Sequence, residues 1–199
     1  MPSIALTGGI ASGKTTFGKL LASLGIPTVD ADEIVHVLHR PEGEAAKWVA
    51  RQFGSQYLNP DGSTDRRRLG ELVFADRTAR MSLENCIHPL VREALLDCKK
   101  KHESPGSVFV AQIPLLFESN WEHDWDFTAT VETRPELQLE RLMGRGFAEI
   151  EAKKRIQTQL PPSERMRRAD FILRNDAELE QLHQLAIVFA RHFNLSVPD

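Results

Sequence analysis

Apolar residues occur along this chain in short unbroken runs that are bounded by glycine, proline and polar residues. Runs without alternation are typical of parallel strands that helices cover on both faces. They predict strands over residues 3–7, 26–30, 108–113, 127–131 and 171–173. Because helical patterns separate these runs, the order of elements predicts an α/β domain with a five-stranded parallel sheet and right-handed crossovers.

Apolar positions at spacings of three and four residues predict the helices that connect these strands. The first helix begins near Lys14 and ends at Gly25, and its apolar positions are Phe17, Leu20, Leu21 and Leu24. The last helix spans residues 177–195, and its expected core positions are Leu179, Leu182, Ala186, Phe189 and Phe193. Further helices are predicted after residue 31 and over residues 148–159. The segment Thr133-Arg134-Pro135-Glu136 has the form of a capping box with proline in the first turn, which predicts another helix start.

Residues 41–106 carry a helical pattern without the signature of a parallel strand. The sequence Asn59-Pro60-Asp61-Gly62-Ser63 interrupts this pattern with the chemistry of a turn. A long helix over residues 78–101 is expected to kink or break near His88, because Pro89 removes a backbone donor. The apolar residues expected to pack this segment as a small helical unit are Trp48, Phe53, Leu69, Leu72, Val73 and Phe74. We interpret the segment as an insertion beside the sheet.

The composition is that of a globular protein, with 41% hydrophobic residues, 27% charged residues and a formal net charge of -3. This charge argues against general binding of nucleic acid or of an acidic membrane surface. Between residues 141 and 168 the balance reverses, with eight basic and three acidic residues. A solvated helix face explains most runs of this kind. Carried on a helical pair between two strands, however, these arginines favour a closing lid.

The two cysteines, Cys86 and Cys98, lack the spacing of a metal-ligand or redox pair. The sequence shows no signal peptide and no apolar run near the ~18 residues that a membrane span requires. These features predict a cytoplasmic protein with free thiols and no membrane partner. The expected assembly is a monomer or a small homo-oligomer.

Residues 6–16 contain the pattern Gly8-x-x-x-x-Gly13-Lys14-Thr15, between the first strand and the first helix. This is the pattern of the phosphate-binding loop in P-loop nucleotide-binding proteins. A glycine-rich turn that opens a helix directs backbone N–H groups and the positive end of the helix dipole at one small volume. Lys14 is expected to reach the β and γ phosphates, and the Thr15 hydroxyl to bind Mg²⁺. The loop residues predicted to contact ATP are Gly8, Gly9, Ile10, Ala11, Ser12, Gly13, Lys14, Thr15 and Thr16.

These elements combine into a three-layer P-loop NTPase fold with a helical insertion and a helical lid. The predicted nucleotide-binding core consists of residues 1–40, 107–140 and 166–199. The insertion covers residues 41–106, and the lid covers residues 141–165.

Two carboxylates, Asp30 and Asp32, follow the second strand at the edge where open α/β sheets bind ligands. Aspartate at this position can also cap the helix that follows. The pair therefore has two interpretations, a site for chemistry and a helix cap.

Short motifs are spread over the whole chain: Leu6-Thr7-Gly8-Gly9-Ile10, Val29-Asp30-Ala31-Asp32, Asp65-Arg66-x-x-Leu69, Val73-Phe74, Ile87-His88-Pro89-Leu90, Pro114-Leu115-Leu116-Phe117-Glu118, and Ala169-Asp170-Phe171-Ile172 with Asn175. They resemble the motifs of the dephospho-CoA kinase family, which uses ATP to phosphorylate the ribose 3′-hydroxyl of dephospho-CoA in the last step of coenzyme A biosynthesis. The Asp-Ala-Asp and Pro-Leu-Leu-Phe-Glu segments are the specific ones, because many kinases and NTPases share the P-loop. The resemblance implies that the helical insertion binds dephospho-CoA.

The resemblance also implies roles for individual residues. Asp32 would be the general base that takes the proton from the 3′-hydroxyl. Arg141, with Arg145 beside it on the lid, would stabilise the transferring phosphoryl group and contact ATP. Asn175 would lie on the adenine side of ATP. The residues implied for binding of the acceptor substrate are Asp32, Arg66, His88, Pro89 and Glu118.

Three of these residues have other interpretations. His88 can hydrogen-bond a helix end, and Arg66 can be an ordinary surface residue. Glu118 can be an acidic residue behind the site or a charge at a helix start.

The sequence departs from the family pattern at Ala11, Gly146 and Ala177. Alanine at position 11 is tolerated if the local φ is negative. The other two departures leave the lid contacts and the adenine site open.

Two other functions compete with this interpretation. Another small-molecule kinase or a nucleoside monophosphate kinase shares the core and the lid. A regulatory switch of the GTPase type belongs to a different class, but the chain lacks the guanine-reading Asn-Lys-x-Asp segment. That function would also leave the arginine lid unexplained.

Overall fold

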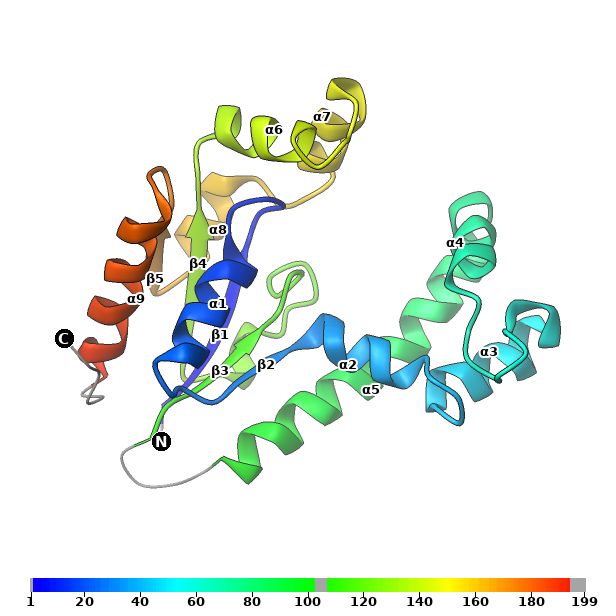
Figure 1. Cartoon of the computed structure of the whole chain (residues 1–199). Helices are drawn as coiled ribbons and strands as arrows, with labels where there is room; N and C mark the ends of the chain where they lie inside the picture. The colour runs from blue at the N-terminus through cyan, green and yellow to red at the C-terminus, as the bar shows by residue number, and fades with distance from the viewer. Residues whose placement is uncertain (1, 103–106, 194–199) are drawn as a thin grey trace. The chain divides into compact units, whose positions relative to one another are not determined.

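The structure is a computed structural model that describes residues 2–102 and 107–193 (Figure 1). Its strands are β1 (Ser3–Gly8), β2 (Thr28–Asp30), β3 (Phe109–Gln112), β4 (Phe127–Glu132) and β5 (Phe171–Arg174). Its helices are α1 (Lys14–Ser23), α2 (Ala31–Leu38), α3 (Glu44–Phe53), α4 (Arg66–Ala75), α5 (Arg77–Lys101), α6 (Pro135–Met143), α7 (Glu149–Gln157), α8 (Pro162–Arg168) and α9 (Leu179–His192), with single 3₁₀ turns at Ser55–Tyr57 and Glu122–Asp124. The chain divides into two compact units, unit 1 (Met1–Val29 and Lys99–Asp199) and unit 2 (Asp30–Cys98).

Unit 1 is built on a five-stranded sheet with the strand order β2-β3-β1-β4-β5. The central strand β1 runs parallel to β3 on one side and to β4 on the other, and β5 runs parallel to β4. In this register Ala5 lies opposite Ala111 of β3 and Thr128 of β4. The predicted five-stranded parallel sheet is confirmed. Strands β2 and β3 lie on one side of β1, and β4 and β5 lie on the other. The carboxyl end of β1 is therefore a topological switch point, where open α/β sheets bind ligands.

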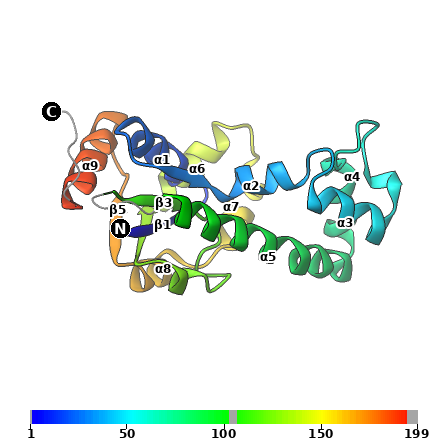
Figure 2. The same ribbon diagram turned by 90° about the horizontal axis from the view of Figure 1, so that it is seen from below.

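Helices α1 and α9 cover one face of the sheet, and α8 lies on the other face (Figure 2). The core between the sheet and the first two helices consists of large apolar side chains that include Ile4, Leu6, Phe17, Leu21, Val110, Val131, Leu173 and Phe189. The helix-period prediction for residues 177–195 holds at Leu182 and Ala186, which are buried. Leu179 is 62% exposed, so its assignment to the core is wrong. It is the first residue of α9 and lines a pocket of unit 1 instead.

The start of α6 differs from the predicted capping box. The N-cap is Arg134 and the helix begins at Pro135. The Thr133 hydroxyl donates to the carbonyl oxygen of Asn175 at 2.7 Å, and a carboxylate oxygen of Asp176 accepts the Arg134 N–H at 2.7 Å. The N-cap N–H is therefore bound by a carboxylate from the loop after β5, whereas the sequence predicted a partner from the first turn of the same helix. Helix α8, which begins at Pro162 directly after Pro161, was not predicted.

Unit 2 contains α2, α3, α4 and most of α5. The predicted turn is present, with the Gly62 N–H donating to the carbonyl oxygen of Asn59 at 2.9 Å. Phe74 is 94% exposed, so its assignment to the packed interior is wrong. The sequence predicted a kink or a break near His88. A break is wrong, because α5 continues as one helix through Pro89, and a kink stays a prediction.

Packing explains why α5 tolerates its proline. Ile87, Val91 and Leu95 are buried at helical spacing on both sides of Pro89. Burial of a large apolar side chain contributes about 1.5–3 kcal/mol, and a proline inside a helix costs ~3 kcal/mol. Tertiary contacts of this size outweigh the local penalty.

Within the described ranges, no helix combines the length and the apolar character that a bilayer crossing demands.

Candidate active site

The loop that joins β1 to α1 has the conformation of a phosphate cradle. Gly13, its last residue, has a φ of +101° and precedes the first turn of α1. The N–H groups of a first helical turn have no acceptor within the helix, so they can donate to an anion. The Ser12 N–H donates to the carbonyl oxygen of Gly9 at 3.0 Å and closes the turn. Alanine at position 11 was expected to be tolerated if its φ is negative. The φ of Ala11 is +59°, so this condition is not met and the backbone there is strained.

Lys14 and Thr15 lie at the start of α1, as the loop pattern predicts. Lys14 is only 9% exposed, whereas Thr15 and Thr16 are exposed. A lysine held in this way presents its charge at the helix N-terminus with little freedom to move. The exposed Thr15 hydroxyl is available as a single oxygen ligand.

Two glutamines, one from α6 and one from the segment after α7, hold the backbone of Ile10 in this loop. The amide of Gln138 donates to the carbonyl oxygen of Ile10 at 2.8 Å, and the side-chain oxygen of Gln159 accepts the Ile10 N–H at 2.6 Å. An apolar cluster lies beside these hydrogen bonds, and it consists of Ile10, Ala11, Leu139, Leu142, Phe147, Ala152 and Ile156. Helices α6 and α7 are therefore packed directly on the phosphate loop. Sequence reasoning missed both glutamines, which have no motif of their own.

Arg141 of α6 contacts the same loop. Its guanidinium donates from Nη1 to the carbonyl oxygen of Ala11 at 3.2 Å and from Nη2 to that of Asn175 at 3.2 Å. In this structure Arg141 thus orients the loop backbone, in addition to any contact with phosphate.

Arg141, Arg145 and Asn175 line one pocket of about 270 Å³ in unit 1. The phosphate loop contributes Ala11, Gly13 and Thr16 to its lining. The predicted ATP contacts from the lid and from the loop after β5 are thus brought together. Sequence reasoning missed the residues that α9 and the preceding loop add to the lining, which are Ala177, Glu178, Leu179 and Leu182. Their position after the carboxyl end of β5 was the signal that could have revealed them.

A buried ion pair lies behind the loop. Arg165 binds both carboxylate oxygens of Glu132, with N–O distances of 2.7 and 2.8 Å, and the two side chains are 4% and 1% exposed. The Thr130 hydroxyl donates to the same carboxylate at 2.6 Å. A Cβ at Gly9 would lie 2.8 Å from Nη2 of Arg165 and 2.6 Å from the amide of Gln138. Glycine at position 9 therefore lets these side chains support the loop. The sequence signal for this pair was a glutamate inside a buried strand.

Glu118 contacts the end of the lid segment. One of its carboxylate oxygens accepts the backbone N–H of Leu160 at 3.0 Å. Glu118 follows β3 without starting a helix, so the interpretation as a helix-start charge is wrong. The interpretations of Glu118 as an acidic residue behind the site and as an acceptor contact stay predictions.

In unit 2, Asp30 and Asp32 have different roles. Asp30 is the N-cap of α2, and its Oδ1 accepts the Asp32 N–H at 2.9 Å. Capping is thus performed by the first aspartate. The second, Asp32, lies exposed in the first turn of α2. The capping interpretation therefore applies to Asp30, and the role of Asp32 in the chemistry stays a prediction.

The other predicted acceptor contacts also lie in unit 2. Arg66 is the first residue of α4, and its Nη1 is 3.5 Å from Nδ1 of His36. His88 and Pro89 are exposed near the middle of α5. His88 lies inside α5 and not at its end. Both of its interpretations, a contact with the acceptor and a hydrogen bond to a helix end, stay predictions. Arg66 of α4 and His88 of α5 thus belong to the same unit.

A parallel sheet whose central strand leads through this glycine-rich loop into a helix, with α6 and α7 packed on the loop, defines a P-loop kinase. The sequence model described as dephospho-CoA kinase matches residues 3–181. The chain belongs to the dephospho-CoA kinase family, and it is an ATP-dependent kinase that transfers a phosphoryl group to a hydroxyl.

Individual relatives support this placement. The dephospho-CoA kinase of Bacillus cereus (strain ATCC 10987 / NRS 248) is 38% identical over 194 residues, which cover 96% of this chain and 97% of that protein. The crystal structure of TT1252 from Thermus thermophilus is 34% identical, with a TM-score of 0.79 over 96% of this chain and 97% of the other. Dephospho-CoA kinase from Campylobacter jejuni is 28% identical, with a TM-score of 0.71 and the same coverage.

Proposed function

We propose that this kinase transfers the γ-phosphoryl group of ATP to the ribose 3′-hydroxyl of dephospho-CoA and releases CoA and ADP. The observation that carries the proposal is the separation of roles between Asp30 and Asp32 in a chain of this family. Asp30 caps α2, and the exposed carboxylate of Asp32, in the first turn of the same helix, would act as general base. A carboxylate in this role accepts the proton of the acceptor hydroxyl as the oxygen attacks phosphorus.

The phosphate loop would supply the positive charge that the phosphoryl transfer requires. Lys14 and the N–H groups at the start of α1 would bind the β and γ phosphates, where negative charge concentrates during transfer. Arg141 and Arg145 would contribute further positive charge from the lid side of the same pocket. In this scheme Arg66, His88 and Pro89 would bind the rest of the acceptor, and Glu118 would keep the lid segment in place.

Mg²⁺ fits the donor set of the loop. The described residues contain no group of three acidic, histidine or cysteine side chains able to hold a metal ion. Mg²⁺ in kinases needs no such cage, because phosphate oxygens and water fill most of its coordination sphere. Thr15 would supply one hydroxyl ligand, and the bound ion would neutralise charge on the phosphate oxygens.

The decisive assay uses the purified protein with ATP, Mg²⁺ and dephospho-CoA, and follows formation of ADP and CoA. Asp32→Asn should lower kcat by roughly 10²–10⁴-fold while the Kd for ATP stays unchanged. Glu33→Gln is the matched control, since it removes an exposed carboxylate from the same helical turn. Absence of CoA formation by the wild type would refute the proposal. Equal losses in Asp32→Asn and Glu33→Gln would refute the role of Asp32.

We further propose that the protein works in the cytoplasm with ATP and dephospho-CoA as its partners, without nucleic acid or membrane. The net charge of -3 supports this proposal. Size-exclusion chromatography with light scattering would decide between a monomer and a small homo-oligomer.

A further inference from the structure

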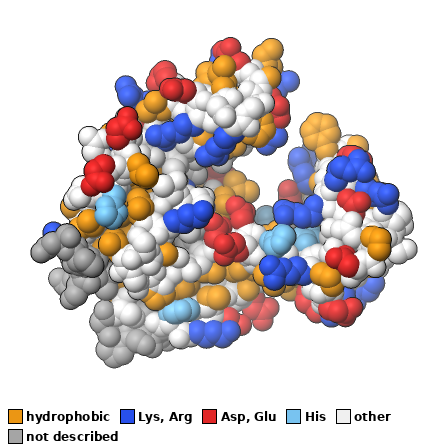
Figure 3. All heavy atoms as spheres, viewed as in Figure 1, with side chains coloured by type: hydrophobic (Ala, Val, Ile, Leu, Met, Phe, Trp, Pro, Cys, Tyr) orange, Lys and Arg blue, Asp and Glu red, His pale blue; other side chains and the backbone are white. Residues whose placement is uncertain are grey.

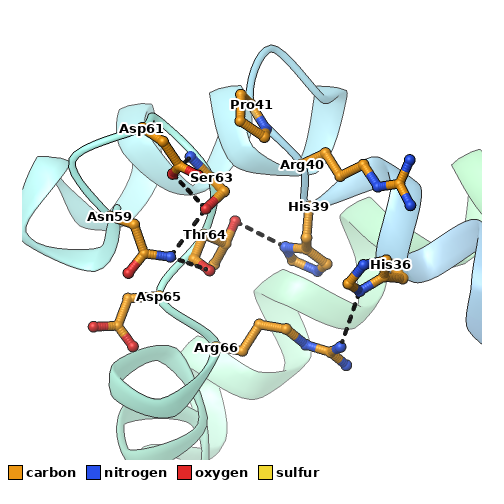
Figure 4. Close-up of a pocket in the computed structure, with 10 residues that line it drawn as sticks. All are labelled: His36, His39, Arg40, Pro41, Asn59, Asp61, Ser63, Thr64, Asp65 and Arg66. Atoms are coloured by element: carbon orange, nitrogen blue, oxygen red, sulfur yellow. Dashed lines mark hydrogen bonds between the residues drawn. The ribbon is translucent and has the colours of Figure 1, made fainter.

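Unit 2 contains a second pocket, with a volume of about 420 Å³. Figure 4 shows its lining, which comes from the C-terminal half of α2, the turn that follows, the loop before α4 and the first residue of α4. Histidine and basic side chains gather on this part of unit 2, as Figure 3 shows. The pocket lies apart from the phosphate loop in sequence, and none of the roles above explains its histidines.

The basic groups of the pocket share one side of it. The side chains of Arg40 and Arg66 extend in the same direction, with His36 between them (Figure 4). Both guanidinium groups are exposed, and Nη1 of Arg66 lies 3.5 Å from Nδ1 of His36. Among the residues that the structure describes, neither arginine is paired with a carboxylate. Two unneutralised guanidinium groups on one wall favour an anionic ligand.

The two carboxylates of the lining are already engaged elsewhere. Asp61 accepts the N–H and the hydroxyl of Ser63 at 2.9 and 2.6 Å, and these hydrogen bonds lower the pKa of Asp61. Asp65 caps α4 by accepting the N–H groups of Arg67 and Arg68 at 3.1 and 3.0 Å. Asp65 also pairs with Arg68, at 3.3 Å between Oδ2 and Nε. Among the described residues, neither carboxylate forms an ion pair with Arg40 or Arg66.

The floor of the pocket is a fixed imidazole. His39 is 8% exposed, and its Nδ1 is 2.9 Å from the buried hydroxyl of Thr64. This hydrogen bond sets the orientation of the ring. Burial, followed by the positive charges of Arg66 and His36, lowers the pKa of His39. The neutral ring at pH 7 leaves the arginines as the charged part of the site.

We propose that this pocket binds a phosphate or diphosphate group, with Arg40 and Arg66 as its charged contacts and His36 as a third polar contact. Guanidinium groups bind phosphate oxygens through paired hydrogen bonds, which suits a tetrahedral anion better than a single carboxylate.

The arrangement of α2 favours the diphosphate of the acceptor substrate as the occupant, an assignment that rests on the proposed function. Asp32 and His36 are four residues apart, so they lie on the same side of α2 with Cβ atoms about 5–6 Å apart. This separation is comparable with the span from a ribose 3′-oxygen to its 5′-phosphate. A substrate whose 3′-hydroxyl meets Asp32 would then present its 5′-diphosphate to the arginine wall. A separate phosphate-bearing ligand is the other source of the same chemistry.

Inorganic diphosphate is the probe for the pocket itself. The phosphate loop is first filled with a non-hydrolysable ATP analogue, and the ring resonances of His36 and His39 are followed by NMR during titration. Both should shift, and Kd should rise about tenfold or more for each arginine replaced in Arg40→Gln and Arg66→Gln. Arg67→Gln is the matched control, since Arg67 is exposed and pairs with Glu71 at 2.9 Å. Unmoved histidine resonances, or equal Kd values in all variants, would overturn the proposal.

Enzyme kinetics distinguish the two possible occupants of the pocket, which are the diphosphate of the acceptor substrate and a separate phosphate-bearing ligand. If the pocket holds the diphosphate of the acceptor, both arginine variants raise the KM for dephospho-CoA about tenfold and leave kcat nearly unchanged, unlike Asp32→Asn. If it serves a separate ligand, the NMR titration responds while this KM does not change, and the acceptor assignment fails. A wild-type protein without dephospho-CoA kinase activity would refute the proposed function, yet the diphosphate titration would still decide whether the pocket binds anions. Circular dichroism confirms that each variant is folded.

Discussion

Asn175 donates a hydrogen bond from Nδ2 to the carbonyl oxygen of Ser12, at 2.7 Å, and thereby joins the loop after β5 to the phosphate loop. Asn175 is 7% exposed, and its own carbonyl oxygen accepts from Arg141 and from the Thr133 hydroxyl. One residue thus connects β5, the start of α6 and the cradle. Besides lining the nucleotide pocket, Asn175 supports the loop that receives the phosphates.

Removing this support should weaken ATP binding. Asn175→Ala removes the 2.7 Å donor of the Ser12 carbonyl oxygen and leaves only the longer contact from Arg141, at 3.4 Å. Loss of such a hydrogen bond costs about 1 kcal/mol. We expect roughly tenfold weaker ATP binding by isothermal titration calorimetry, together with a lower free energy of unfolding. Asn175→Asp keeps the size of the side chain but replaces the donor with a carboxylate, so it should lose at least as much. Wild-type affinity in Asn175→Asp would show that the donor is irrelevant.

Gly13 should be intolerant of any side chain. Its φ of +101° disfavours L-residues, and an added Cβ would lie 2.1 Å from Nδ2 of Asn175. Gly25 is the control, with a φ of +82° and nothing within 4 Å of the added Cβ. Gly25→Ala should cost only the backbone strain, about 1–2 kcal/mol, and leave ATP binding intact. Gly13→Ala should be destabilised further and lose ATP binding. Equal behaviour of the two variants in urea denaturation and calorimetry would contradict this account.

Removing one partner of the buried pair of Glu132 and Arg165 should lower the free energy of unfolding more than removing both charges. Arg165→Met leaves an unpaired carboxylate in the interior, which typically costs 3–5 kcal/mol. The double variant Glu132→Gln with Arg165→Met removes both charges and should recover part of that loss. The exposed pair of Arg155 and Glu151, with an N–O distance of 3.0 Å, is the control, and breaking it should cost less than about 1 kcal/mol. Urea denaturation measures all three. If the double variant is no more stable than the single one, the lost charge pairing is not the cause.

His39 should make the free energy of unfolding depend on pH. Its folded-state pKa lies below the ordinary value of 6.5, because the ring is buried and faces Arg66, His36 and Arg40. As the pH falls below about 6.5, the unfolded chain takes up a proton at His39 that the folded chain refuses, so stability declines. This decline continues until the pH reaches the folded-state pKa. Above pH 6.5 the contribution is fully present.

The measurement compares urea denaturation between pH 7.5 and pH 5.5 in the wild type and in His39→Asn. The variant should lose less stability over this interval than the wild type, whatever its absolute stability. His123→Asn, at an exposed position, should keep the wild-type slope. An identical slope in His39→Asn would remove His39 as the source of the pH dependence.

Local patterns were sufficient for most of the fold. Unbroken apolar runs located all five strands, because a strand covered on both faces has no polar side. Local patterns failed where tertiary contacts outweighed local preference, as at Pro89 inside α5 and at Thr133 before α6. Helix α7 is shorter than predicted at both ends, and α9 begins at Leu179, two residues after the predicted start. Residues 194 and 195 of the predicted last helix lie outside the described residues.

The sequence by itself determined the class of site, because the spacing of Gly8, Gly13 and Lys14 acts within one turn of chain and needs no distant partner. Only the tertiary structure decided what holds that loop in place. Gln138, Gln159 and Asn175 bond to it across 128, 149 and 163 residues of sequence. Isolated polar residues so far apart carry no periodic signal, and their hydrogen bonds form only after the parallel sheet has brought its carboxyl edge together.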